Sequence, residues 1–136
     1  MLHLAEGSDL IPADSFERAQ MFQWLFWEQY SHEHAIAVLR FQRHFLKKAD
    51  DELSDAALPD KCIAVLRLMQ DHLAERSYFV GERLSLADIA LVAYTRFSHH
   101  AGFPLDDPYP SVAAWVARIE TELGLEHAAA DSDPSL

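Results

Sequence analysis

The chain has 136 residues, 50% of them hydrophobic and 24% charged, and its 22 Asp and Glu residues against 11 Lys and Arg give a net charge of −11. The length predicts one domain, and because so negative a surface repels phosphate backbones and anionic lipid, we expect binding neither to nucleic acid nor to membranes. Apolar runs of about 18 residues, which a membrane span needs, are missing, and the single cysteine, Cys62, excludes an internal disulfide and suits a cytoplasmic protein.

The first predicted helix is the longest and covers residues 14–46. Asp14 is suited to be its N-cap, with Glu17 three residues later as a reciprocal partner. Neither Gly nor Pro interrupts the following thirty or so residues, although the sequence allows a kink near Ser31. Five aromatic residues crowd positions 22–30 of this helix and cannot all share one face. The helix is therefore expected to be covered on several sides, by its own core and by another domain or subunit. These residues are Phe22, Trp24, Phe26, Trp27 and Tyr30.

Three further helices are predicted after a charged connection at residues 47–58. Pro59 suits the first turn of the second helix, which runs to about Glu75. The third helix runs from Ser85 to about residue 100, and the fourth starts at Pro110 and ends before Gly124. Strand signals are nearly absent, so the predicted fold class is all-α, a bundle of about four to five helices.

The sharpest local signal surrounds the start of the third helix. Ser85 is placed to accept a hydrogen bond from the N–H of Asp88, whose carboxylate can reach back to the N–H of Ser85. Leu84 and Ile89 are spaced as a hydrophobic staple around this capping box. The alternative, a catalytic Ser85 and Asp88 pair, is less favoured because the capping geometry commits both side chains to the backbone.

Residues 79–88, FVGERLSLAD, resemble the capping-box segment in the C-terminal helical domain of cytosolic glutathione S-transferases. Residues 4–12, 18–25 and 109–118 resemble the domain linker, the long helix and the segment after the central helix of that family, in the same order. Residues 27–33, WEQYSHE, resemble bacterial members. The resemblance covers about residues 1–124 and implies the helical C-terminal domain of a bacterial glutathione S-transferase.

In that family a thioredoxin-like N-terminal domain of about 80 residues, an ordinary size for a small domain, binds glutathione and carries the group that activates its thiol. The resemblance therefore implies that this domain is absent here. Residues 1–13 are expected to be the linker and a remnant of it, residues 14–124 the all-α domain, and residues 125–136 a mobile acidic tail. The resemblance further implies that this chain carries no catalytic residue and is inactive alone. It also implies that glutathione is the co-substrate of the full-length family.

The family's helical half supplies the pocket for the electrophilic second substrate. A polar stripe at helical spacing matches this role on the first helix, with an aromatic residue on the third: Tyr30, Glu33, His34, Ala37, Arg40 and Phe97. The alternative is a solvated face for the charged members and ordinary core packing for the aromatic ones. Both interpretations stay open.

Eight histidines raise the question of a metal site. His32 and His34 point about 200° apart on a helix, and the neighbours His99 and His100 cannot chelate one ion either. We therefore predict no metal. Cys62 is expected to be a small core residue rather than a redox group.

Two functions of different classes are consistent with the sequence. The first is the electrophile-pocket and dimerisation domain of a glutathione S-transferase, with hydrophobic small molecules as ligands. The second is a non-catalytic helical assembly or binding protein derived from that fold. Both predict self-association, as a dimer or other homo-oligomer, through the aromatic part of the long first helix.

Overall fold

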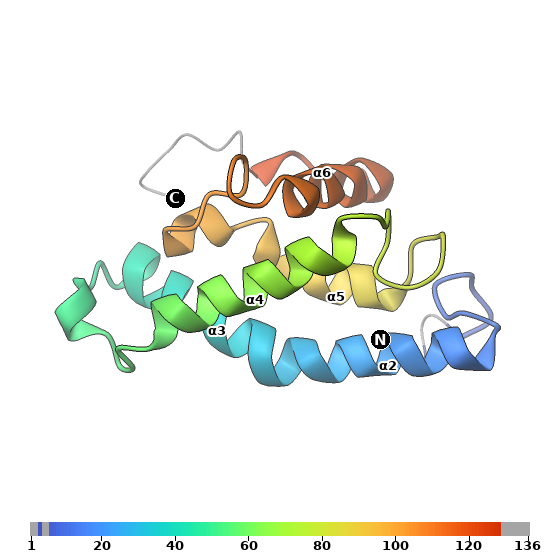
Figure 1. Ribbon diagram of the computed structural model, residues 1–136, viewed down its shortest axis with the longest axis horizontal. Helices are drawn as coiled ribbons and strands as arrows, with labels where there is room; N and C mark the ends of the chain where they lie inside the picture. Colours follow the sequence, from blue (N-terminus) through green and yellow to red (C-terminus); the bar gives the residue numbers. More distant parts are fainter. Residues whose placement is uncertain (1–2, 4–5, 129–136) are drawn as a thin grey trace.

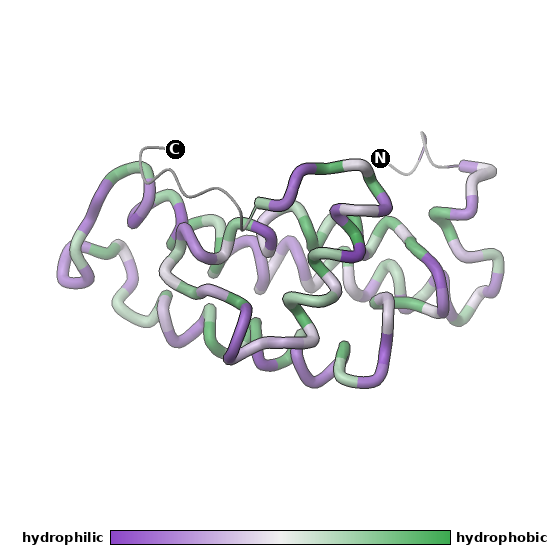
Figure 2. The backbone as a smooth tube through the Cα atoms, turned by 90° about the horizontal axis from the view of Figure 1, so that it is seen from above, coloured by the Kyte–Doolittle hydropathy of each residue, from purple (hydrophilic) through white to green (hydrophobic). Residues whose placement is uncertain are grey.

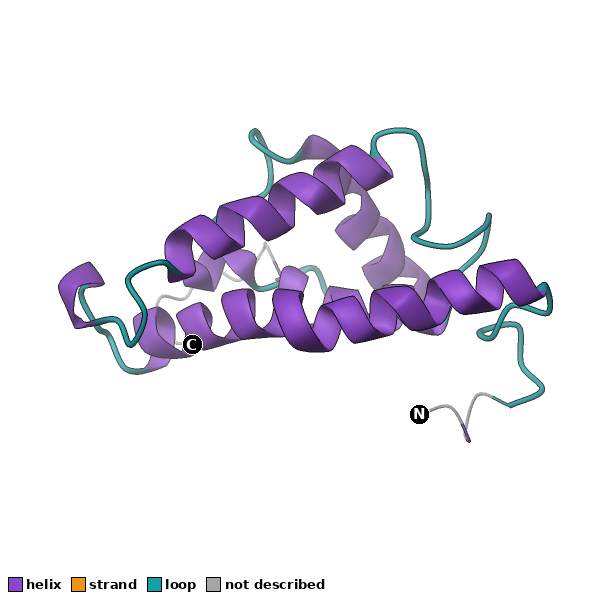
Figure 3. Cartoon of the chain, turned by 60° about the horizontal axis from the view of Figure 1, so that its bottom comes forward, coloured by secondary structure: helices purple, strands orange, loops and turns teal. Residues whose placement is uncertain are grey.

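The computed structural model describes residue 3 and residues 6–128, and this part of the chain forms helices and loops without a strand (Figures 1 and 3). Its α-helices are α2 (Ser15–Trp27), α3 (Glu33–Arg40), α4 (Leu58–Leu73), α5 (Leu86–Thr95) and α6 (Pro110–Leu123). The all-α prediction is confirmed. None of the described helices is both long and apolar enough to cross a bilayer.

The predicted first helix forms as one nearly continuous rod with two π-helical turns. Asp14 Oδ2 accepts the N–H of Glu17 at 3.0 Å, whereas the Glu17 carboxylate lies against Gly81 instead of returning to the cap. The turn η1 (Glu28–His32) joins α2 to α3, and η2 (Phe41–Phe45) follows α3. An i→i+5 bond takes in an extra residue, which rotates the side chains beyond it by about 100° around the axis. The kink allowed near Ser31 therefore corresponds to η1.

α5 is the central helix of the bundle. It packs against α2, α3 and α6, and most of its residues are buried. α4 lies against both α3 and α6, so the core fills the space between these layers. Figure 2 shows polar and apolar residues alternating along the helices, as expected for helices that bury one face. The largest fully buried side chain is that of Trp115 on α6.

The end of α5 differs from the prediction. The α-helix stops at Thr95 rather than near residue 100, and a short 3₁₀ turn, η4 (Ser98–Ala101), follows. Thr95 donates its hydroxyl to the carbonyl of Leu91 at 2.6 Å. Such a bond to the preceding turn loosens and bends a helix. The break places the side chains of residues 97–100 beside η2 rather than along the α5 axis.

Both ends of the described chain are attached to the bundle. The carbonyl of Leu10 accepts the N–H of Leu86 at 3.0 Å, which fixes the predicted linker to the start of α5. Gly124, with φ of 70°, ends α6 in the left-handed conformation, at the boundary predicted for this helix. Ala128, in the predicted tail, is buried. The remainder of that tail, 129–136, and linker residues 1, 2, 4 and 5 lie outside the described residues.

Candidate functional site

Ser85 and Asp88 form the capping box at the start of α5, and both are buried. Asp88 Oδ2 accepts the N–H of Ser85 at 3.0 Å, and Ser85 Oγ accepts the N–H of Ala87 at 3.3 Å. The staple residues Leu84 and Ile89 are half-buried and pack against the core. These contacts commit both polar side chains to the backbone, which is the structural role expected of them.

The second oxygen of Asp88 has partners that the local pattern did not reveal. Asp88 Oδ1 accepts the N–H of Phe79 at 3.0 Å and the indole Nε1–H of Trp115 at 2.9 Å. Burial raises the pKa of Asp88, while its hydrogen bonds act in the opposite direction. One carboxylate therefore joins three segments: the loop before α5, the start of α5 itself, and α6. Trp115 is 27 residues away in sequence, so only the fold could show this contact.

Tyr30 and His34, from the predicted second-substrate set, lie together. They line a pocket of about 560 Å³ between η1 and α4. Gln29, Ser31 and Lys61 contribute polar groups to its wall, and the rest of the lining is Ala64 and Val65. Tyr30 is 86% exposed, so its ring stands at the surface rather than in the core.

Arg40 and Phe97 meet at a different place, where α3 passes the end of α5. The guanidinium carbon of Arg40 lies 4.4 Å from the centre of the Phe97 ring, and Arg40 Nε donates to His100 Nδ1 at 3.2 Å. The rings of His44 and His100 stack at 3.9 Å with 5° between their planes. We call Arg40, His44, Phe45, Phe97 and His100 the Arg40 cluster.

The predicted stripe is therefore divided between two places. Glu33 and Ala37 are half-buried on α3, and the 560 Å³ pocket is lined by neither Arg40 nor Phe97. The predicted stripe assumes 3.6 residues per turn from Tyr30 onward. Tyr30 lies inside η1, where the N–H of Glu33 bonds to the carbonyl of Glu28, so the ideal spacing does not hold at its start.

His32, which the sequence excludes as a metal ligand together with His34, is a buried group. Its Nε2 lies 2.7 Å from Thr95 Oγ1, and because Thr95 donates its own proton to Leu91, Nε2 must be the donor in this pair. Burial lowers the pKa of His32 to about 3, so the ring is neutral. Within the described residues, no group of three His, Cys, Asp or Glu side chains is arranged to hold a metal ion.

Cys62 is also buried, on α4. Burial raises the pKa of its thiol to about 12, with a smaller opposing effect from Arg43. A thiol with so high a pKa carries almost no thiolate near neutral pH, which makes it a poor nucleophile. Its environment is that of a small core residue.

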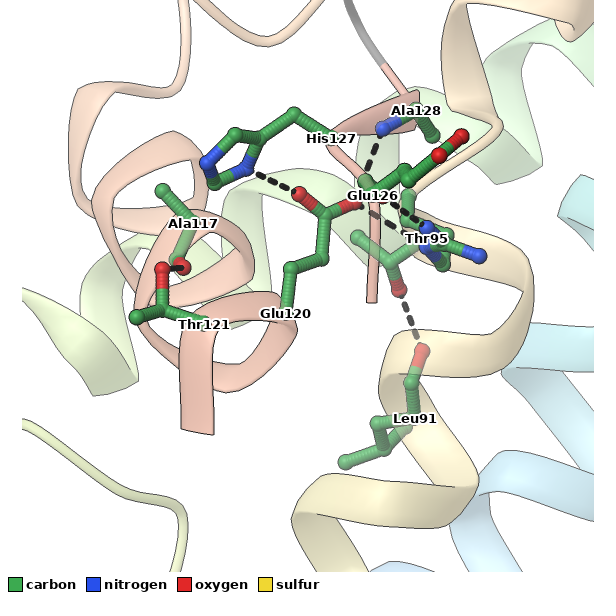
Figure 4. A network of polar contacts seen from close by, with 9 residues as sticks. Leu91, Thr95, Ala117, Glu120, Thr121, Glu126, His127 and Ala128 are labelled. Carbon is green, nitrogen blue, oxygen red and sulfur yellow. Dashed lines mark hydrogen bonds and ion pairs between the residues drawn. The ribbon is translucent and has the colours of Figure 1, made fainter. Parts of the chain in front are cut away.

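Glu120 on α6 organises a polar network that the sequence pattern did not indicate (Figure 4). Its carboxylate accepts from Arg96 Nε at 3.0 Å, His127 Nδ1 at 2.7 Å and the N–H of Ala128 at 3.2 Å. Arg96 also donates to the carbonyl of Glu126. Although burial opposes it, these hydrogen bonds hold the pKa of Glu120 below its usual value. The network joins the segment after α6 to the end of α5.

Comparison with known proteins shows to which family this chain belongs. The family model "Glutathione S-transferase, C-terminal domain" matches residues 29–122. A solved glutathione S-transferase from Xanthobacter autotrophicus Py2 is 39% identical, with a TM-score of 0.85, over 92% of this chain and 61% of that one. Glutathione S-transferase theta-1 from Rattus norvegicus is 30% identical over 120 residues, 83% of this chain and 49% of the rat protein.

Ure2p in complex with glutathione shares the fold at 23% identity, with a TM-score of 0.74, over 88% of this chain and 61% of that one. The chain spans about half the length of the curated relatives it matches. The matched family model, the helical architecture and the Ser85–Asp88 capping box lead to one assignment. The chain belongs to the glutathione S-transferase family and has the fold of its C-terminal domain.

Proposed function

We propose that this chain provides the second-substrate site and the dimer contact of a bacterial, cytoplasmic glutathione S-transferase-like protein. In this proposal glutathione conjugation requires a thioredoxin-like domain as well. The observation that carries it is the family match, which lies in the C-terminal domain. Three groups with shifted pKa values, Asp88, His32 and Cys62, agree with this proposal, because each is buried in the core.

The long helix would serve the two roles at different points along its length. The second substrate is assigned to the Arg40 cluster, where a guanidinium and aromatic rings meet beside α5. The partner copy is assigned to the surface around Phe26 and Tyr30, which are 73% and 86% exposed. Two large exposed rings one turn apart on a helix form an apolar patch, and such patches mark protein–protein contact sites.

Activity measurements test the first role. The purified 136-residue chain is mixed with glutathione and 1-chloro-2,4-dinitrobenzene, and we expect no turnover above the uncatalysed rate. The same chain fused behind the thioredoxin-like domain of the Xanthobacter relative is expected to turn over. Turnover by the chain alone contradicts the proposal. An inactive but folded fusion contradicts it too and favours a non-catalytic assembly protein.

Light scattering coupled to size exclusion tests the second role. The chain is expected to dimerise, and replacing both Phe26 and Tyr30 by Ser is expected to give a monomer. Phe16→Ser is the matched control, because Phe16 is also strongly exposed but lies ten residues earlier on α2, about 15 Å along the helix from Phe26. A monomeric wild-type chain at high concentration, or a Phe26/Tyr30 double variant that still dimerises, contradicts the proposed contact.

A further inference from the structure

Two segments that contain no acidic residue meet at one end of this acidic molecule. Residues 34–49 contain no Asp or Glu but include Arg40, Arg43, Lys47 and Lys48. Residues 89–105 also contain no acidic residue. The fold packs η2, from the first of these segments, against η4, from the second, at the end of the bundle away from the start of α2 (Figure 1). Acidic residues return directly after the first segment, in η3 (Asp50–Glu52), where Asp50 pairs with Arg43.

Among the described residues, Arg40 has no carboxylate partner, in contrast to two neighbouring arginines. Arg43 forms an ion pair with Asp50 at 2.8 Å, and Arg96 forms one with Glu120 at 3.0 Å. The Arg40 side chain instead donates to His100 Nδ1 and lies over the rings of Phe45 and Phe97. Partial burial of a guanidinium without a counter-ion is unfavourable, and burial accordingly lowers the pKa of Arg40 while the nearby Tyr94 acts in the opposite direction.

Flat rings surround this guanidinium. Phe97 lies 4.4 Å below it and Phe45 5.2 Å away, and the Phe97 and His100 rings are nearly parallel, 24° apart at 5.5 Å. His44 extends the stack beyond His100. Arg presents a planar fork of N–H donors that matches a carboxylate, and aromatic faces favour a planar ligand. A small molecule that has both a carboxylate and a planar ring can therefore pair with the guanidinium and pack against the rings at the same time.

We propose that the Arg40 cluster binds the carboxylate group of a planar aromatic acid, so that the second substrate of this protein is an anionic aromatic electrophile. The substrate assignment rests on the proposed function, whereas the binding preference does not. The carboxylate pairs with the Arg40 guanidinium, and the ring packs beside Phe97 and the stacked histidines. The same cluster discriminates against neutral aromatic molecules of equal size, because they leave Arg40 without a counter-ion.

Calorimetric titration of the 136-residue chain with 1-naphthoate and with neutral 1-naphthamide tests the preference. Naphthoate is expected to bind at least about tenfold more tightly, which corresponds to about 1.4 kcal/mol. Arg40→Met is expected to abolish this ratio. Lys47→Met is the matched control, because it removes the same charge from the same end at an exposed site and is expected to leave the ratio nearly unchanged.

Equal affinity for the two probes overturns the inference, as does an unchanged ratio in Arg40→Met or an equal loss in Lys47→Met. If Arg40→Met fails to fold, the N–H resonance of Arg40 Nε in the wild-type chain decides the matter. It is expected to shift with naphthoate and not with naphthamide, and a shift with neither overturns the inference. The chain can bind naphthoate preferentially while its fusion to the thioredoxin-like domain is inactive. That result supports the binding site and contradicts only the proposed function.

Discussion

Asp88→Ala is expected to destabilise the domain far more than the loss of an ordinary helix cap. Asp88 is fully buried and accepts three N–H groups, from Phe79, Ser85 and the Trp115 indole, at 2.9 to 3.0 Å. Each buried donor left without an acceptor costs about 1–3 kcal/mol. Removal of a buried carboxylate recovers part of this sum, since burial raises the pKa of Asp88. We expect a net loss of about 3–5 kcal/mol, a large share of the stability of a small domain.

Urea unfolding followed by far-ultraviolet circular dichroism measures this loss. Ser85→Ala is the first comparison and is expected to lose about 1 kcal/mol, because it removes only one cap acceptor. Asp71→Ala, on the exposed side of α4, controls for the loss of a carboxylate and is expected to stay within about 0.5 kcal/mol of wild type. A loss in Asp88→Ala no larger than that in Ser85→Ala refutes the reasoning, because the Phe79 and Trp115 contacts would then contribute nothing.

A double-mutant cycle isolates the long-range contact. Trp115→Phe removes the indole donor and keeps an aromatic ring in the core. If Asp88 and Trp115 stabilise each other, the double variant is expected to lose at least about 1 kcal/mol less than the two single losses added together. Simple additivity would show that the 2.9 Å contact carries no coupling energy.

Two further predictions concern the dependence of stability on pH. His32 has a folded pKa of about 3 against an ordinary value of 6.5, so the stability present above pH 6.5 is lost as the pH falls, by about 2 kcal/mol between pH 7 and pH 5. In urea titrations at both pH values, His32→Gln is expected to remove this loss and the exposed His34→Gln to keep it; equal behaviour of the two variants contradicts the prediction. Glu120 has a lowered pKa, so its contribution is complete above about pH 4.5 and is lost as the pH falls through the lowered value. Glu120→Gln is therefore expected to cost about 1–2 kcal/mol at pH 7 and less at pH 3.5. Hydrogen exchange at the Ala128 amide is expected to accelerate in that variant, and unchanged protection would contradict the role of the network.

The parts of the fold that depend on local chemistry were predictable from the sequence. The Asp14 and Ser85 caps, Pro59 in the first turn of α4 and the glycine that ends α6 all act within a few residues of one another. The family resemblance added the order of these elements. The contacts of α5 with α2, α3 and α6 make it the central helix.

The arrangement of the candidate site could not be predicted from such local signals. The π-helical turn at residues 28–32 rotates the faces of the long helix, and no single residue type signals it, so a stripe of constant spacing joined Tyr30 to Arg40 although they lie in different surroundings. The stack of His44 on His100 joins residues 56 positions apart, through the early end of α5 at Thr95. Contacts of this kind depend on how helices meet, which periodicity alone does not specify.

In this interpretation the chain supplies a helical half-site, and the groups that bind and ionise glutathione belong to another domain. Titration of the isotope-labelled 136-residue chain with millimolar glutathione, followed by nuclear magnetic resonance, tests this most directly. We expect no saturable shift for the backbone amides of α2 to α6. Saturable shifts that map the tripeptide onto these helices would contradict it.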